Sequence, residues 1–218
     1  QLYFSYKILN KFTKNNFFSF IGSLFFLVSP IFIFRTGLHP ALAGQWILLL
    51  TLYLGLTKIY SESKLLWVFV LSLSSLIHFY FTIIISIIFA IFRISNFFIY
   101  KESFFQIIKD FFITFIYLLL TMYIIGYFEV RIVDALGPGF GEYKLNLLSI
   151  FDSFNAEKQV AWSRILPDIQ VTKNESAEGF NYLGLGQILM ILTSLILFLK
   201  KKGEENLIHL KKNKKIKI

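Results

Sequence analysis

Residues 65–92 read LLWVFVLSLSSLIHFYFTIIISIIFAIF, a run without a charged side chain. In a helix, about 20 apolar residues suffice to cross the ~30 Å hydrocarbon layer of a membrane. As one helix this run would be about 42 Å long, at about 1.5 Å per residue. Its polar residues Ser72, Ser74, Ser75 and His78 lie near the middle, where lipid penalises them. We therefore predict a hairpin of two helices that turns at these residues, with a single tilted crossing as the alternative.

Four further apolar runs cover residues 17–34, 41–57, 111–128 and 183–199. Backbone groups in lipid must bond within their own segment, and none of the runs alternates like a barrel strand, so we expect helices. Charged residues make up only 16% of the chain, whereas an average soluble domain has about 25%. The sequence predicts an all-α integral membrane protein with about six transmembrane or half-spanning helices and one extracytoplasmic loop segment.

The basic residues, which give a net charge of +9, stand at the ends of the apolar runs and in the C-terminal tail. This distribution is typical of cytoplasmic membrane loops and argues against a nucleic-acid partner. Lys200, Lys201 and Lys202 place the C-terminus in the cytoplasm. The hairpin then puts the basic residues within 7–14, 58–64 and 93–109 on the cytoplasmic side as well. Abundant Lys, Asn, Ile and Phe suggest AT-rich coding, so we expect a bacterial inner (plasma) membrane protein.

The predicted organisation has four parts. Residues 1–128 form a transmembrane helical bundle, and 129–182 form an extracytoplasmic segment with a short interfacial helix over 142–154. Residues 183–199 form the last transmembrane helix, and 200–218 form a basic cytoplasmic tail that attracts anionic membrane lipids. Because the chain begins with Gln1, we expect it to be the C-terminal part of a longer protein.

Two groups of candidate residues lie at predicted helix ends. Arg35 could grip a phosphate or carboxylate, His39 could move a proton, and Gln45 follows in the same segment. The alternative is an ordinary interfacial turn in which Arg35 reaches back to the membrane surface. His78 and Tyr80 could line a polar cavity, or His78 could only be a hydrogen-bonded residue at the helix break.

The predicted extracytoplasmic segment carries three further candidates. Backbone N–H groups of the segment 137–141, with Gly139 and Gly141, could bind phosphate oxygens, although such a segment is more often a tight turn. Arg164 could meet an anionic headgroup, and Glu178 could be a base or a metal ligand, but both could also be exposed loop charges. There is no Cys, no H-E-x-x-H and no G-x-S-x-G motif, so the residues alone do not establish catalysis.

As a set, five stretches resemble an uncharacterised family of bacterial multi-pass membrane proteins. They are SPIFIFRTGLHPALAGQWILLLTLYL at 29–54, SLIHFYF at 75–81, GPGFGEYKLNLLSIFD at 137–152, WSRILPD at 162–168 and EGFNYLGLG at 178–186. That family is similar to the GT-C glycosyltransferases, polytopic enzymes that use lipid-phosphate-linked sugars. It often has His at the position of Gln45, which weakens any strict role for this residue.

The resemblance implies transfer of sugar from a polyprenyl-phosphate donor on the extracytoplasmic side, in cell-envelope glycan synthesis. The catalytic acidic residue is then expected upstream of Gln1, no cofactor is named, and a divalent metal ion stays open. Substrate contacts are expected from the candidates given above: Arg35, His39, Gln45, His78, Tyr80, Gly139, Gly141, Arg164 and Glu178.

Two other functions remain open. A transporter or a lipid or glycan flippase is one, because Pro30 and Gly55 interrupt apolar runs, although no second half of the chain mirrors them. A non-enzymatic assembly protein of envelope biogenesis is the other.

Overall fold

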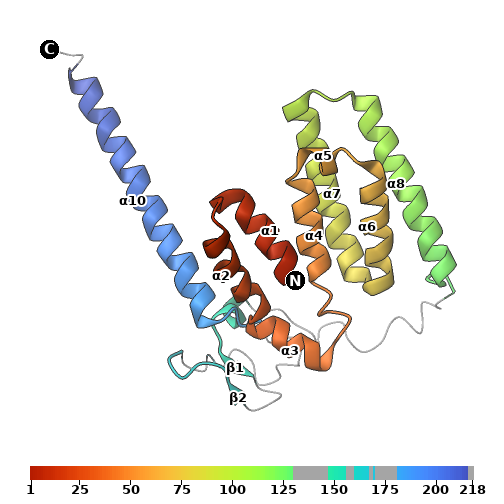
Figure 1. The fold of residues 1–218 in the computed structure, drawn as a ribbon, viewed down its shortest axis with the longest axis horizontal. Coiled ribbons are helices and arrows are strands. Elements are labelled where there is room, and N and C mark those ends of the chain that lie inside the picture. The colour runs from red at the N-terminus through yellow and green to blue at the C-terminus, as the bar shows by residue number, and fades with distance from the viewer. Residues whose placement is uncertain (130–146, 156–159, 167–168, 170–180, 216–218) are drawn as a thin grey trace. The chain divides into compact units, whose positions relative to one another are not determined.

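The computed structural model describes residues 1–129, 147–155, 160–166, 169 and 181–215, the last thirteen of them by backbone alone. The chain divides into two compact units, Gln1–Glu142 and Tyr143–Ile218, which are described separately. The first unit is a helical bundle (Figure 1). Its helices are α1 Leu2–Thr13, α2 Asn16–Leu27, α3 Pro30–Leu38, α4 Trp46–Gly55, α5 Lys58–Ser61, α6 Lys64–Ile77, α7 Phe79–Tyr100 and α8 Phe104–Ile125.

Only some of these helices reach the length of a membrane crossing. In the described part of the chain, α7 and α8 are long and apolar enough to cross a membrane, and the bent pair α2–α3 adds a third span if it counts as one. Helices α4 and α6 are apolar but have 10 and 14 residues. The structure is thus a mostly helical fold with two or three candidate spans, and it does not show the six predicted from sequence.

The run 17–34, predicted as one helix, is broken at Ser29. This residue is extended, and its side chain accepts a hydrogen bond from the Phe32 amide, which caps the start of α3. Pro30 occupies the first position of α3, where its missing N–H is not needed. The two helices consequently meet at a bend of 46°.

The predicted hairpin within residues 65–92 is confirmed. Helix α6 ends at Ile77 and α7 begins at Phe79, so His78 alone separates them. The Ser74 hydroxyl donates to Thr82 Oγ1 at 3.2 Å, and Trp67 packs against Phe89 further along, so α6 and α7 run antiparallel. Figure 1 shows the two helices side by side.

Two elements extend beyond their predicted limits. Helix α7 continues through Arg93 to Tyr100, although the sequence predicted a loop from Arg93 onward. Helix α8 begins at Phe104, before the predicted start at residue 111, and includes Asp110. Both charged residues are tolerated inside helices because they bind each other.

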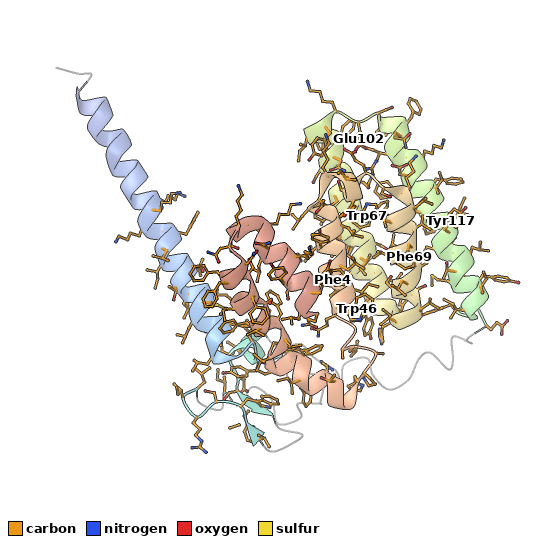
Figure 2. All side chains as sticks on the ribbon, in the orientation of Figure 1. Phe4, Trp46, Trp67, Phe69, Glu102 and Tyr117 are labelled. Carbon is orange, nitrogen blue, oxygen red and sulfur yellow. The ribbon has the colours of Figure 1, made fainter. Side chains whose placement is uncertain are left out.

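The core of the first unit lies between α4, α6 and α7, with part of α8 against it. Eight buried side chains form it: Ile47, Leu54, Trp67, Val70, Leu71, Phe81, Ile85 and Phe89. Phe92 occupies the space that a side chain on Gly55 would need, which brings α4 close to α7. Near the other end of α4, Trp46 stacks with Phe4 of α1 at 6.3 Å between ring centroids (Figure 2).

The second unit contains the 3-10 helix η1 Leu147–Ile150, the strands β1 Phe154–Asn155 and β2 Val160–Ala161, and the helix α10 Leu185–Lys215. The two strands pair antiparallel. In its described part, the predicted interfacial helix over 142–154 is therefore replaced by η1 and β1. Asp152 ends the helical turn, because its carboxylate accepts a hydrogen bond from the Phe154 amide at 3.0 Å. Helix α10 runs on through much of the predicted basic tail.

Candidate functional site

One end of the first unit, which we call the His78 end, begins with the break between α6 and α7. The His78 amide still bonds to the Ser74 carbonyl as the last turn of α6. The residue itself is extended, with φ −166° and ψ 137°, and its Nδ1 accepts a hydrogen bond from the Tyr80 amide at 3.2 Å. His78 thus ends one helix through its backbone and caps the next through its side chain.

This capping bond determines what the imidazole can do chemically. An accepting Nδ1 places the proton of a neutral ring on Nε2, which is then a hydrogen-bond donor. The ring lies 4.7 Å from the Tyr80 ring, between centroids, and it is partly exposed. Tyr80 is exposed as well. The pair can therefore offer two donors, Nε2–H and a phenol O–H, to an oxygen of an approaching molecule.

The loop between α3 and α4 packs onto this break. Gly44 is buried, and a Cβ placed on it would lie 2.7 Å from the Ile77 side chain and 3.3 Å from that of Phe81. Only glycine allows so close an approach without displacing the α6–α7 turn. The neighbouring Gln45, half-buried, makes no capping bond to α4, so its amide is not used there.

The C-terminal end of α8 completes the His78 end. The Tyr127 hydroxyl donates to the Ser75 carbonyl at 3.0 Å, and its ring lies 5.9 Å from that of Phe79. Further along the helices, Thr121 donates to the Ser72 hydroxyl at 3.0 Å. The serines that marked the turn in sequence therefore serve contacts between helices as well as the turn.

The predicted site residues are only partly brought together. Gln45, His78 and Tyr80 lie at the His78 end, on two elements in contact. Arg35 is buried on α3, and His39 ends that helix one turn later, with its amide bonded to the Arg35 carbonyl. Arg164 is exposed in the second unit, so it is not placed relative to them. The predicted contacts Gly139, Gly141 and Glu178 lie outside the described residues.

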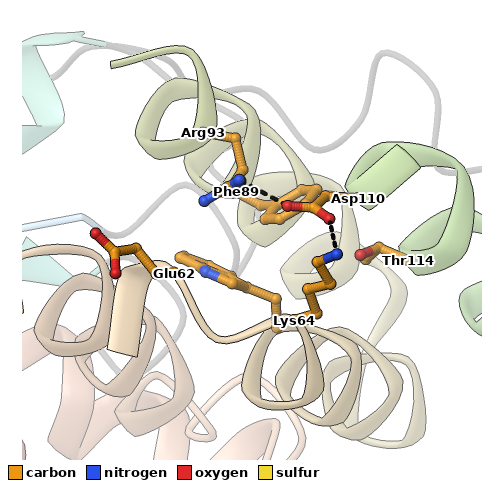
Figure 3. Close-up of a pocket in the computed structure, with 7 residues that line it drawn as sticks. Glu62, Lys64, Phe89, Arg93, Asp110 and Thr114 are labelled. Carbon is orange, nitrogen blue, oxygen red and sulfur yellow. Dashed lines mark hydrogen bonds and ion pairs between the residues drawn. The ribbon is translucent and has the colours of Figure 1, made fainter. Parts of the chain in front are cut away.

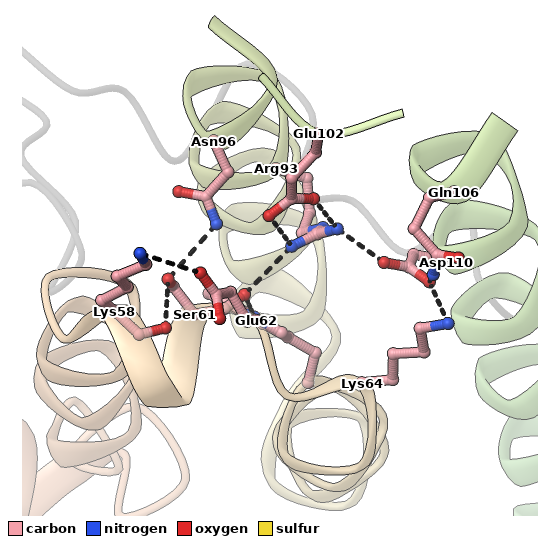
Figure 4. Close-up of polar contacts among 10 residues, drawn as sticks. Lys58, Ser61, Glu62, Lys64, Arg93, Asn96, Glu102, Gln106 and Asp110 are labelled. Atoms are coloured by element: carbon pink, nitrogen blue, oxygen red, sulfur yellow. Dashed lines mark hydrogen bonds and ion pairs between the residues drawn. The ribbon is translucent and has the colours of Figure 1, made fainter. Parts of the chain in front are cut away.

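The opposite end of the first unit carries an ion-pair network that sequence reasoning missed. Arg93 of α7 lies at its centre with 3% of its side chain exposed. Its Nη2 is 2.6 Å from Glu102 and 2.6 Å from Asp110 of α8, while Nη1 donates to the Ser61 carbonyl at 3.3 Å (Figure 4). We call this the Arg93 end.

Asp110 is the second centre of the network. It accepts from Arg93, from Lys64 of α6 at 2.8 Å and from Gln106 at 2.8 Å. Two cations and two carboxylates balance in charge, which is what burial of ions requires. The sequence holds only a weak signal for this: Arg93 and Asp110 each stand at the edge of an apolar run, and a buried ion in lipid needs a partner.

A narrow recess borders the network (Figure 3). Its lining residues are Glu62, Lys64, Trp67, Phe89, Arg93, Asp110 and Thr114. It encloses about 150 Å³ of empty space, part of it open to solvent, whereas ligand pockets measure about 300–1,000 Å³. The recess is thus too small for an ordinary ligand, and the ion pairs beside it hold α5, α6, α7 and α8 together. We therefore place the candidate binding site at the His78 end. Among the described residues, no three His, Asp or Glu side chains gather as a metal site would need.

Comparisons with known proteins bear on the whole chain. No curated protein and no solved structure matches it. The resemblance to the GT-C glycosyltransferases therefore stays a prediction. A family model described as a domain of unknown function, DUF6311, matches residues 1–214, and the chain belongs to this family.

Proposed function

We propose that this chain acts in membrane sugar transfer, similar to the GT-C glycosyltransferases, and that the His78 end binds the phosphate of a polyprenyl-phosphate-linked sugar. The observation that carries the proposal is the contact of Gly44 with Ile77 and Phe81. It joins two segments that are far apart in sequence, and each of them bears polar side chains that the resemblance assigns to substrate binding.

The charge distribution supports this end as the extracytoplasmic one. The basic residues of α5, α6, the α7–α8 connection and the C-terminal end of α1 gather at the Arg93 end. Positive residues favour the cytoplasmic side, which leaves the His78 end facing out. A polyprenyl-phosphate donor whose headgroup lies on the extracytoplasmic side of the membrane would meet the protein at the His78 end.

The chemistry of the side chains fits a phosphate. In sugar transfer the bond between the sugar C1 and the phosphate oxygen breaks, a bond from C1 to the acceptor oxygen forms, and the acceptor hydroxyl gives its proton to a general base. Negative charge then grows on the departing polyprenyl phosphate. The Gln45 amide, the His78 Nε2–H and the Tyr80 hydroxyl at this end are donors that stabilise such an oxygen anion. The resemblance adds the guanidinium of Arg35, on the helix that leads into the Gly44 loop.

The test is sugar transfer by the full-length protein in membranes, with donor and acceptor supplied. We expect Arg35→Gln to lower transfer by about a hundredfold, the scale of one lost donor to a developing anion. His78→Asn keeps a side chain that caps α7 but removes the imidazole donor, so transfer should fall while the protein amount is unchanged. Lys109→Gln, an exposed charge on α8 at the other end, is the control and should transfer normally. Normal transfer by both site variants would refute the proposal.

A lipid-linked glycan flippase is the second candidate, favoured by the 46° bend between α2 and α3 at Ser29–Pro30. Broken helices of this kind occur at the binding sites of transporters. In the same membranes a flippase would move the lipid-linked sugar to the other leaflet with its glycosidic bond intact. Loss of donor with formation of a new glycosidic bond excludes this function.

A further inference from the structure

Four exposed lysines form a continuous basic ridge across the Arg93 end. The basic ridge consists of Lys11, Lys14, Lys58 and Lys101. Lys11 Nζ lies 2.8 Å from the Thr57 hydroxyl, and Lys58 is the next residue. The Lys58 ammonium lies 4.5 Å from the centre of the Tyr100 ring, and Lys101 follows directly. Three helices, α1, α5 and α7, therefore contribute to one positively charged strip.

In the described part of the chain, the acidic neighbours do not neutralise the positive charge of this ridge. Glu102 and Asp110 bind Arg93 and Lys64 in the network below. Glu62 reaches Lys58 at 4.0 Å, but both side chains are largely exposed, and such pairs bind weakly. The ridge therefore keeps a net positive charge that an external anion can meet.

The backbone of the ridge gives a second, independent observation. Among the described residues, Lys14 with φ 52° and Lys101 with φ 55° are the non-glycine residues at positive φ. Each is the left-handed cap that ends its helix, a position where glycine is normally used because a side chain is strained in this conformation. At both positions the chain carries a charged side chain where the backbone alone would favour glycine.

The surface beside the ridge is apolar. Exposed side chains there include Ile59 of α5, Phe98 and Ile99 of α7 and Phe105 of α8. A nucleic acid or an acidic peptide would leave these side chains in water. An amphiphile with an anionic headgroup satisfies both parts, because its phosphate meets the lysines while its acyl chains cover the apolar residues.

We propose that the basic ridge is a binding site for the headgroups of anionic phospholipids. The site lies at the opposite end of the bundle from His78 and does not depend on the proposed sugar transfer. Lipid binding here holds the α1, α5 and α7 ends in one plane. It also sets the depth of the bundle in the cytoplasmic leaflet.

The test uses the purified full-length protein in a non-ionic detergent. Phosphatidylglycerol and phosphatidylcholine are titrated, and bound lipid is counted by native mass spectrometry. The variant is Lys14→Gly with Lys101→Gly, which removes two charges and leaves the backbone in its preferred state. The control is Lys14→Arg with Lys101→Arg, which changes the same two side chains but keeps their positive charge. Circular dichroism and thermal unfolding verify that both variants fold.

We expect the ridge variant to bind phosphatidylglycerol about 25-fold more weakly, since each lysine near an anionic surface contributes about fivefold. Its affinity for phosphatidylcholine should not change, and the control should stay within about twofold of the unchanged protein. Equal losses in variant and control would refute binding through the lysine charges, as would equal binding of the two lipids. Displacement of phosphatidylglycerol by millimolar inorganic phosphate would also overturn the proposal, because it would indicate a site for free phosphate.

Discussion

Breaking the pair between Arg93 and Asp110 is expected to destabilise the bundle by about 3 kcal/mol. Removing one partner of a buried ion pair typically costs 3–5 kcal/mol, because the other charge stays buried. Asp110→Leu leaves Arg93 with Glu102, whose side chain is 18% exposed, so the loss should lie at the low end. Arg93→Met leaves Asp110 with Lys64 and Gln106 and should lose a similar amount.

The double variant is the informative one. Because Arg93→Met with Asp110→Leu removes both buried charges, we expect a total loss of about 3 kcal/mol rather than the sum, and hence a coupling energy of about 3 kcal/mol. The free energy of unfolding is measured in detergent by denaturant titration. Trp67, which lines the same recess, reports on this region by fluorescence. Glu62→Gln, an exposed charge beside the recess, is the control and should change stability by less than about 0.5 kcal/mol. Additive losses of about 6 kcal/mol in the double variant, or losses below about 1 kcal/mol in the single variants, would refute the claim that the network holds these helices together.

Three further predictions concern packing, capping and topology. Gly55→Ala should destabilise the bundle by about 1–3 kcal/mol because its methyl group meets Phe92, and Phe92→Leu in the same chain should restore part of the loss in denaturant titrations. His78→Ala should lower the free energy of unfolding by about 1 kcal/mol through loss of the α7 cap, whereas His78→Asn should stay close to the unchanged protein; equal losses would contradict the capping role. In intact cells a cysteine at Tyr80 should react with a membrane-impermeant thiol reagent, and one at Glu62 only after lysis; the reverse pattern would overturn the orientation.

The α6–α7 hairpin was predictable because its signal is local. Ser72, Ser74, Ser75 and His78 stand together in a run too long for one crossing, and a polar group at that depth indicates a turn. The structure refines the position to His78. Ser75 belongs to the predicted turn but is buried, whereas Tyr80 is exposed. Tyr80 is therefore the better position for the cysteine-labelling experiment.

The Arg93 end was not predictable from local signals. Arg93 and Asp110 each look like the edge of an apolar segment, so the sequence placed loops around them. In the structure they lie inside helices, because each provides the other's counter-charge across a distance of 17 residues along the chain. The bend at Ser29 was missed although Pro30 interrupts its run, because a proline can either kink a continuous helix or begin a new one. The hydrogen bond from the Phe32 amide to the Ser29 side chain shows that Pro30 begins α3.

Of the nine substrate contacts predicted from the sequence, the structure brings Gln45, His78 and Tyr80 to one end of the bundle, and the sequence did not predict this arrangement. Residue types singled out Gln45, His78 and Tyr80, yet nothing in the sequence indicated that Gly44 would seat its loop on the α6–α7 turn. That contact depends on the absence of a side chain, and an isolated glycine between two apolar runs carries little information by itself.

The unequal lengths of the bundle helices have a consequence for the surrounding lipid. Helix α6, with 14 residues, is about 21 Å long, whereas α8, with 22 residues, is about 33 Å long. At the His78 end the two helices finish level, because Tyr127, just after α8, bonds to Ser75 near the end of α6. The extra length of α8 lies at the Arg93 end, where Asp110, six residues into α8, pairs with Lys64, the first residue of α6. A bilayer that covers the exposed start of α8 must become thinner or admit water over the start of α6. We therefore expect lipid headgroups to come close to Lys64 and the ion pairs behind it.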